Sequence, residues 1–278
     1  MSQITKPFQG WFFIFGRHRL FLAFLIRSIF FLHGESLLVK QTRVKVSVIM
    51  PAYNAAAYID EAIQSVLAQN GVVFELLVGD DASTDDTWKR VTAYRSDPRV
   101  RIFRFLKNRG TAATRNRLIA KAKGQYISSC DADDMFLPGN LRLLTKVLDQ
   151  RPGFGVAYGN WYRVSHTGRR CHYRRKYIFR KGWDLLGLHF ANGGTLVRRV
   201  LVNKVGGYRT KFKFLEDCDL FLRLSEITRF YHFPGKPLYC RRRTPGSLSR
   251  QPKKEYQRVT RQIFNDAVQR RYGYKVKW

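Results

Sequence analysis

The feature that most constrains the fold is a repeated alternation of strand-like and helix-like segments between residues 43 and 150. Apolar segments of strand length begin near residues 43, 74, 99 and 124, and each is followed by a segment of helical length and periodicity. This spacing is typical of βαβ crossovers, which place consecutive strands in parallel in one sheet. The sequence therefore predicts an α/β domain with a mainly parallel sheet flanked by helices.

A cluster that contains polar residues follows each of these four segments. Because ligands bind beyond the carboxyl ends of parallel strands, we expect these residues to face one crevice. They are Pro51, Ala52, Tyr53 and Asn54; Asp80 and Asp81; Lys107, Asn108 and Arg109; and Asp131, Ala132, Asp133 and Asp134.

Two of these clusters have more than one interpretation. DADD, residues 131–134, can bind a divalent cation and a ribose, but the same pattern also forms Asx turns and helix caps. DDASTDDT, residues 80–87, can contact a ligand or cap the helix that starts at Thr87. Arg115 can be a solvated helix charge or can point back at a nucleotide.

The regular alternation fades after residue 150. Residues 163–181 are rich in Lys and Arg and contain no acid, and paired glycines at 193–194 and 206–207 indicate turns. Three acids then cluster in FLEDCDLF, residues 214–221, at the start of a predicted helix. The pattern of residues 253–275 fits one basic amphipathic helix.

The N-terminal segment WFFIFGRHRLFLAFLIRSIFFLHG, residues 11–34, is apolar and aromatic but is interrupted by Arg17, His18, Arg19 and Arg27. The interruptions disfavour a membrane-spanning helix and a signal peptide. An amphipathic helix at an anionic membrane surface fits better, and a helix docked on this protein's own core or on a partner is the alternative. We divide the chain into 1–42, a membrane-associating segment; 43–250, the main domain with halves 43–135 and 136–250; and 251–278, a basic tail.

Composition narrows the classes of partner. The formal net charge of +31 predicts an anionic partner such as a membrane surface, a phosphorylated substrate or nucleic acid. The four cysteines are far apart with no CxxC pair, which favours a reducing cytosol over a disulfide framework. No GxGxxG follows the first strand and no P-loop motif occurs, so a dinucleotide oxidoreductase and a P-loop NTPase are disfavoured.

Five ordered blocks closely resemble the family 2 glycosyltransferases, whose fold is GT-A. They are VSVIMPAYNAAAYIDEAIQSVLAQ, FELLVGDDASTDDT, NRGTAATRNRLIAKAKGQYISSCDADD, GGTLVRRVLVNKVGGYRT and FLEDCDLFLRLSE, within about residues 44–250. The resemblance implies transfer of one sugar, with inversion, from a nucleotide-diphosphosugar, most often a UDP-sugar.

The resemblance also implies roles for individual residues. Asp217 would be the base that takes the proton of the acceptor hydroxyl, and Asp133 would bind Mn²⁺ or Mg²⁺. Gly193, Gly194, Glu216 and Arg242 would belong to the loops around donor and acceptor. The nucleotide-sugar would contact Pro51, Ala52, Tyr53, Asn54, Asp80, Asp81, Asn108, Arg115, Asp131, Ala132 and Asp133.

Asp217 has a simpler alternative, a carboxylate that stabilises the first-turn amides of its helix, and we expect Asp219 to support the same helix start. Two positions depart from the family pattern. Ala82 replaces the usual glycine of the second block, which could alter a turn, and Thr244 stands where a His often follows an Arg. The QxxRW motif of processive synthases is absent, which favours transfer of a single sugar.

The sequence-based hypothesis is a glycosyltransferase at the inner, cytosolic face of the cell membrane. Its acceptor would be a lipid-linked or cell-envelope glycan. One alternative is a nucleic-acid-binding protein, for which HYRRKYIFRKGW is suggestive but no recognisable binding module is present. The other alternative is a membrane-bound scaffold that resembles a glycosyltransferase but is catalytically silent.

Overall fold

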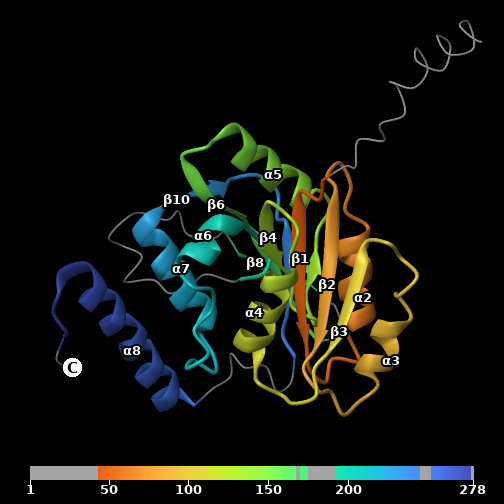
Figure 1. The fold of residues 1–278 in the computed structure, drawn as a ribbon, viewed down its shortest axis with the longest axis horizontal. Coiled ribbons are helices and arrows are strands. Elements are labelled where there is room, and N and C mark those ends of the chain that lie inside the picture. Colours follow the sequence, from red (N-terminus) through yellow and green to blue (C-terminus); the bar gives the residue numbers. More distant parts are fainter. Residues whose placement is uncertain (1–42, 167–169, 175–191, 245–251, 277–278) are drawn as a thin grey trace, which may run out of the picture. The chain divides into compact units, whose positions relative to one another are not determined.

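A seven-stranded sheet forms the centre of the protein, with strand order β10-β6-β9-β4-β1-β2-β3 (Figure 1). β1 pairs in parallel with β2 and β4, and β2 pairs in parallel with β3, whereas β9 is antiparallel to both of its neighbours. The mainly parallel α/β fold predicted from the sequence is confirmed. The strands are β1 (Val46–Ala52), β2 (Phe74–Asp80), β3 (Val100–Arg104), β4 (Tyr126–Ser129), β6 (Phe154–Gly159), β9 (Thr195–Arg198) and β10 (Arg229–Phe233).

Helices cover both faces of this sheet (Figure 1). α2 and α5 pack on one face, and α4, α6 and α7 pack on the other, as the two large clusters of buried side chains show. The short α3 follows β2 and contacts α2. The helices are α2 (Ile59–Leu67), α3 (Thr87–Thr92), α4 (Thr111–Lys121), α5 (Asn140–Gln150), α6 (Arg199–Lys204), α7 (Glu216–Ile227) and α8 (Lys253–Tyr272).

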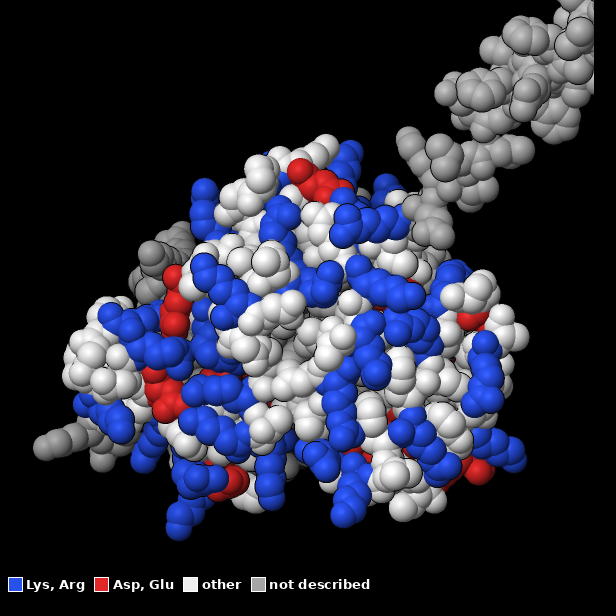
Figure 2. Space-filling model, viewed as in Figure 1, with Lys and Arg blue, Asp and Glu red and all other residues white. Residues whose placement is uncertain are grey.

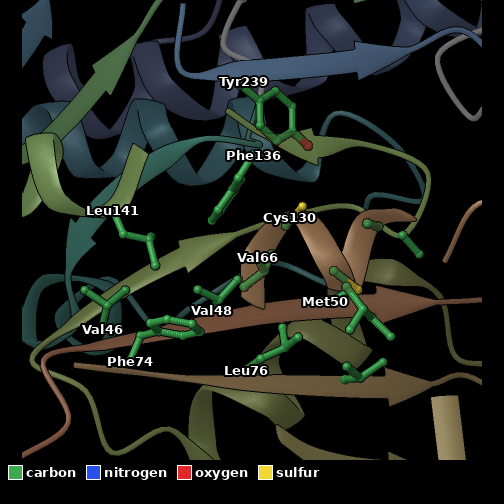
Figure 3. Close-up of a cluster of buried hydrophobic side chains, with 14 of the residues drawn as sticks. Val46, Val48, Met50, Val66, Phe74, Leu76, Cys130, Phe136, Leu141 and Tyr239 are labelled. Carbon is green, nitrogen blue, oxygen red and sulfur yellow. The ribbon is translucent and has the colours of Figure 1, made fainter. Parts of the chain in front are cut away.

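The two cores follow from the alternation of side chains along β1. Val46, Val48 and Met50 point into the cluster shared with α2 and α5 (Figure 3), whereas Ile49 points into the cluster shared with α4 and α7. All four side chains are fully buried. A strand buried on both faces reads as a continuous apolar run, which is why VSVIM marked the start of the domain.

A second, four-stranded sheet has the order β5-β11-β7-β8. Its strands are β5 (Met135–Phe136), β7 (Trp161–Val164), β8 (Arg170–Arg174) and β11 (Tyr239–Arg242). β5 comes directly after the DADD segment, and β11 pairs with it in antiparallel. This pairing brings residues about 100 positions later in the chain to the acidic turn that follows β4.

The computed structural model describes residues 43–166, 170–174, 192–244 and 252–276, which belong to one unit, Arg43–Trp278. Within these ranges, the chain forms no helix that is both long and apolar enough to cross a membrane. The expected basic C-terminal helix is present as α8, which packs against α7 (Figure 1). The predicted N-terminal amphipathic helix lies outside the described residues.

Candidate active site

The first three strands end side by side. Ala52 lies opposite Asp80 in the register of β1 and β2, and Asp80 lies opposite Arg104 in that of β2 and β3. The fourth segment joins the same edge, because the amide of Cys130 donates to the carbonyl of Ile49 in β1 at 3.1 Å. The structure therefore places the predicted polar residues at one edge of the sheet.

Hydrogen bonds between the loops hold this edge in shape. The Asn54 side-chain oxygen accepts a hydrogen bond from the Thr84 amide at 2.9 Å, and the Asn54 amide donates to the Ser83 hydroxyl at 3.0 Å. The buried Asp81 carboxylate accepts from the Gly110 amide at 2.8 Å and from the Arg109 amide at 3.1 Å. Asp81 thus fixes the loop that leads into α4.

The other predicted nucleotide-binding residues of the first loops differ in exposure. Pro51 and Ala52 are buried at the end of β1, whereas Tyr53 is 49% exposed. Asn108 is exposed, and its side chain accepts from the Gly110 amide at 3.1 Å. Asp80 is fully buried, and its carboxylate lies 3.6 Å from Arg104 Nε. Of this group, Tyr53 and Asn108 are the side chains that a ligand can reach without rearrangement.

Arg115 connects the acidic turn after β4 with the start of α7. It is 4% exposed, its Nη2 donates to Asp131 Oδ1 at 2.6 Å, and its Nη1 donates to Glu216 Oε1 at 2.5 Å. Its guanidinium also lies 5.3 Å from the centre of the Tyr208 ring. Burial lowers the pKa of Arg115, but the Asp131 and Glu216 carboxylates raise it by more, so Arg115 carries a charge. Because Arg115 is buried and paired, it is not a solvated helix charge, whereas its contact with a nucleotide stays a prediction.

The DADD turn presents one carboxylate that is fixed by a hydroxyl group. Thr244 Oγ1 donates to Asp133 Oδ2 at 3.0 Å, and Asp131 retains 35% side-chain exposure. Burial and the nearby Asp131 charge raise the pKa of Asp133. Two carboxylates in this position repel each other, and a cation placed between them and a ligand would relieve the repulsion.

This donor set fits a hard divalent cation. Carboxylate and hydroxyl oxygens suit Mg²⁺ and Mn²⁺, and Mg²⁺ is usually bound by one or two carboxylates together with substrate phosphates and water. Within the described ranges, no three His, Cys, Asp or Glu side chains are placed to hold a metal ion together. Oxygens from a substrate would therefore be needed to complete the coordination around Asp133.

Asp134, the last acid of the turn, is buried and makes its hydrogen bonds within the protein. It is 4% exposed and accepts hydrogen bonds from the Tyr239 hydroxyl at 2.7 Å and the Arg242 amide at 2.6 Å. Arg242 is also buried, and its guanidinium binds the Asp133 carbonyl at 3.1 Å and Glu61 at 2.5 Å. The structure thus gives Arg242, which we expected in the donor and acceptor loop, partners that hold the backbone of the turn.

Gly193 and Gly194 pack closely under Tyr239. A Cβ atom on Gly193 would lie 1.9 Å from Tyr239 Cζ, and one on Gly194 would lie 2.8 Å from Tyr239 Cβ. Gly194 also has a φ of 68°, which favours glycine. These glycines let the Tyr239 hydroxyl come within 3.4 Å of the Asp131 amide.

The three acids of FLEDCDLF have different surroundings. Burial raises the pKa of Glu216 to about 7, against the lowering effect of Arg115. Asp217 is partly exposed, and its carboxylate accepts from the Cys218 amide at 2.8 Å. Asp219 is fully buried and pairs with Arg209 and Arg223, so its carboxylate binds two guanidinium groups and not the amides of the helix start.

Sequence reasoning did not single out Arg241, which lies among the acids of the site. Burial lowers its pKa, but Asp134, Asp217 and Asp131 raise it by more. Sequence reasoning also did not single out Tyr208. This side chain is 5% exposed, and its hydroxyl lies 2.9 Å from the side-chain amide of Asn192. Arg241 is one of 51 Lys and Arg residues, and no local pattern distinguishes it from the others.

Comparison with known proteins identifies the family. Residues 47–207 match the family described as Glycosyl transferase family 2. The chain is 41% identical over 124 residues to the succinoglycan biosynthesis protein ExoO of Rhizobium meliloti, an alignment that covers 45% of this chain and 35% of that protein. The chain spans 20% to 23% of the length of three other curated relatives.

Solved structures share the fold. The protein matches S. aureus TarS 1-349 in complex with UDP at a TM-score of 0.64 and 21% identity, over 84% of this chain and 67% of that one. It also matches the mannosyltransferase PcManGT of Pyrobaculum calidifontis, solved with GDP-Man and Mn²⁺, at a TM-score of 0.59 and 20% identity, over 82% and 65% of the two chains. With a GT-A fold and a family match across more than half of its length, the chain belongs to glycosyl transferase family 2.

Proposed function

We propose that this protein transfers one sugar, with inversion, from a nucleotide-diphosphosugar to a hydroxyl group of a lipid-linked or cell-envelope glycan. The observation that carries the proposal is the Arg115 bridge. It ties Asp131, at the end of β4, to Glu216, next to Asp217, so that a donor-binding acid and a candidate base flank the same edge of the sheet.

In the proposed reaction, Asp217 accepts the proton of the acceptor hydroxyl while the acceptor oxygen attacks the anomeric carbon of the sugar. The bond from that carbon to the diphosphate breaks on the opposite face, which inverts the configuration. Asp133 would hold Mn²⁺ or Mg²⁺, and the cation, when bound, would neutralise charge on the departing diphosphate. Asn54, Asp81 and Asn108 would shape the nucleoside side of the site.

UDP is the nucleotide we favour, because it is the one bound in the TarS structure, whereas PcManGT was solved with GDP-Man. The name of ExoO supports an acceptor in polysaccharide biosynthesis. Lys and Arg cover much of the face shown in Figure 2, where Asp and Glu are sparse. Each basic residue near an anionic membrane contributes about 1 kcal/mol of binding, so we propose a peripheral location on the inner face of the membrane.

The donor site can be tested by calorimetric titration with UDP, GDP and dTDP, each with and without Mn²⁺. We expect one nucleotide to bind in a metal-dependent manner, and Asp133→Ala to remove that dependence. Asp149→Ala is the matched control, because Asp149 pairs with Lys45 at the far end of α5. Absence of binding by all three nucleotides would contradict the proposal and would favour a silent scaffold.

Inversion is tested separately by nuclear magnetic resonance of the product. We expect the anomeric configuration of the transferred sugar to be opposite to that of the donor. Retention of configuration would contradict the role proposed for Asp217 while leaving the donor site intact.

A further inference from the structure

α8 lies outside the residues matched by the family and packs directly on the helix that carries Asp217. Its side chains Val259, Ile263 and Ala267 form a buried cluster with Phe212, Phe214 and Leu222. Ion pairs add to this contact, since Asp266 lies 2.8 Å from Arg209 and Arg270 lies 2.9 Å from Glu226. α8 is therefore held along α7, from the segment that leads into α7 to its last turn.

This packing brings Tyr256 of α8 to the candidate base. The Tyr256 ring stacks on Phe214, with centroids 6.3 Å apart and planes 20° apart. Phe214 lies three residues before Asp217, so the stacking places Tyr256 beside the start of α7. In agreement with this position, burial, Cys218 and Asp217 raise the pKa of Tyr256, and Arg241 lowers it. Among the residues that the structure describes, none forms a hydrogen bond with the Tyr256 hydroxyl.

Arg241 approaches the same place from β11. Side chains two apart on a strand share a face, so Arg241 lies on the side of β11 where Tyr239 packs on Gly193 and Gly194. The neighbouring Arg242 is fixed by Asp133 and Glu61, as described above. By contrast, no residue within the described ranges is hydrogen-bonded to the Arg241 guanidinium.

The acids near Arg241 leave it available for a ligand. Asp131 is already paired with Arg115, and Asp134 is bound by the Tyr239 hydroxyl and the Arg242 amide. A partly buried guanidinium to which no described residue is hydrogen-bonded is a strong binding group for a phosphate.

We propose that Arg241 and Tyr256 form an acceptor subsite that takes a hydroxyl compound bearing a phosphate group close to the reacting hydroxyl. Arg241 binds the phosphate, and Tyr256 donates a hydrogen bond and presents its ring to the acceptor. The subsite rests on the proposed function, because it assigns groups beside the candidate base Asp217 to the acceptor.

The test is calorimetric titration of glycerol 3-phosphate into the full chain saturated with Mn²⁺ and the nucleoside diphosphate that binds in the titrations above, with glycerol as the uncharged comparison. We expect binding of glycerol 3-phosphate only. A charge-assisted hydrogen bond contributes about 1.5–3 kcal/mol, so Arg241→Gln should weaken the affinity roughly tenfold or more. Tyr256→Phe keeps the stacking on Phe214 and should weaken it a few-fold.

Arg243→Gln is the matched control, because Arg243 is an exposed neighbour with the same charge, and it should leave the affinity within about twofold. Equal losses in Arg241→Gln and Arg243→Gln, or no loss in Arg241→Gln, would overturn the subsite. A loss of nucleotide affinity in Arg241→Gln with unchanged glycerol 3-phosphate binding would assign Arg241 to the donor diphosphate instead. These outcomes leave the proposed function standing, whereas absence of nucleotide binding overturns both.

Discussion

Arg115 Nη1 and Glu216 Oε1 lie 2.5 Å apart and join α4 to α7 across 101 residues of sequence. Because Arg115 also binds Asp131, one buried cation compensates two carboxylates. Removal of one partner from a buried ion pair leaves an uncompensated charge, which is more costly than loss of the pair itself.

Arg115→Met should therefore lower the free energy of unfolding by about 3–5 kcal/mol, as measured by urea unfolding. Arg117→Met is the control on the same helix. Arg117 stacks over Phe105 at 4.4 Å, and loss of that contact should lower the free energy of unfolding by about 1 kcal/mol or less. Similar losses in both variants would show that the bridge does not hold the site together.

Thr244 provides a second test, since its hydroxyl donates to Asp133. Thr244→Val keeps the shape of the side chain but removes the hydrogen bond that orients the carboxylate. Loss of a group that hydrogen-bonds a metal ligand typically weakens metal binding by about 10- to 100-fold. We expect Thr244→Val to weaken nucleotide binding in the presence of Mn²⁺ by about tenfold.

The control for this substitution is Thr145→Val in α5. Thr145 Oγ1 is buried and has no hydrogen-bond partner among the described residues. Its replacement should leave nucleotide affinity unchanged and should not lower stability. Unchanged Mn²⁺ dependence in Thr244→Val would show that Asp133 is oriented by other groups.

Ala82 is strained by its backbone. Its φ is 64°, in the left-handed region that costs a residue with a Cβ atom about 1–2 kcal/mol. Glycine adopts this conformation freely but loses more chain entropy on folding, about 0.5–1 kcal/mol. Ala82→Gly should raise the free energy of unfolding by about 0.5–1 kcal/mol.

Ala120→Gly, at an exposed position of α4, should have the opposite effect and lower stability by about 1 kcal/mol. Urea unfolding of the two variants compares them directly. A loss of stability in Ala82→Gly would mean that the loop does not store this strain.

Glu75 predicts a pH dependence of stability. Burial raises its pKa, but hydrogen bonds from the Ser47 hydroxyl, the Lys123 amide and Arg101 lower it by more, to below its usual 4.5. The unfolded chain therefore binds a proton first as the pH falls. The stabilisation by Glu75 is complete above pH 4.5 and is lost as the pH falls through the lower folded-state pKa.

Glu75→Gln should lower the free energy of unfolding by about 2–3 kcal/mol at pH 7 and make its decline below pH 4.5 shallower than in the unmodified protein. The exposed Glu255→Gln serves as control and should change neither quantity appreciably. Parallel pH profiles for the unmodified protein and Glu75→Gln would contradict this account.

The sequence predicted those parts of the fold that depend on local pattern. FELLVGD coincides with β2, and the helix expected to start at FLEDCDLF begins at Glu216. The antiparallel β9 and the pairing of β11 with β5 depend on contacts between distant segments, and no local signal marks them. Ala82 has a φ of 64°, a conformation that favours glycine, and hydrogen bonds that join Asn54 and Asp80 to Ser83 and Thr84 flank it. The effect of Ala82 on the turn stays a prediction.

The candidate site was likewise predictable only where a local sequence pattern marks its residues. The acids of DADD were marked by their position after a strand, and Glu216 and Asp217 by their position at the start of a predicted helix. The family resemblance assigned their roles. Arg241 and Tyr256 become candidates only when the fold brings β11 to the acidic turn that follows β4 and brings α8 to α7. The roles of Asp133 and Asp217 remain predictions, which turnover measurements can test.

The central claim is that Asp217 removes the proton of the attacking hydroxyl. The most direct measurement is the rate of nucleoside diphosphate release from the accepted donor sugar, with water as acceptor, in Asp217→Asn and in the unmodified protein. Asn keeps the size of the side chain but cannot accept the proton, so we expect the rate to fall by about 10²–10⁴-fold while nucleotide affinity stays within about twofold. Full activity in Asp217→Asn would contradict the account.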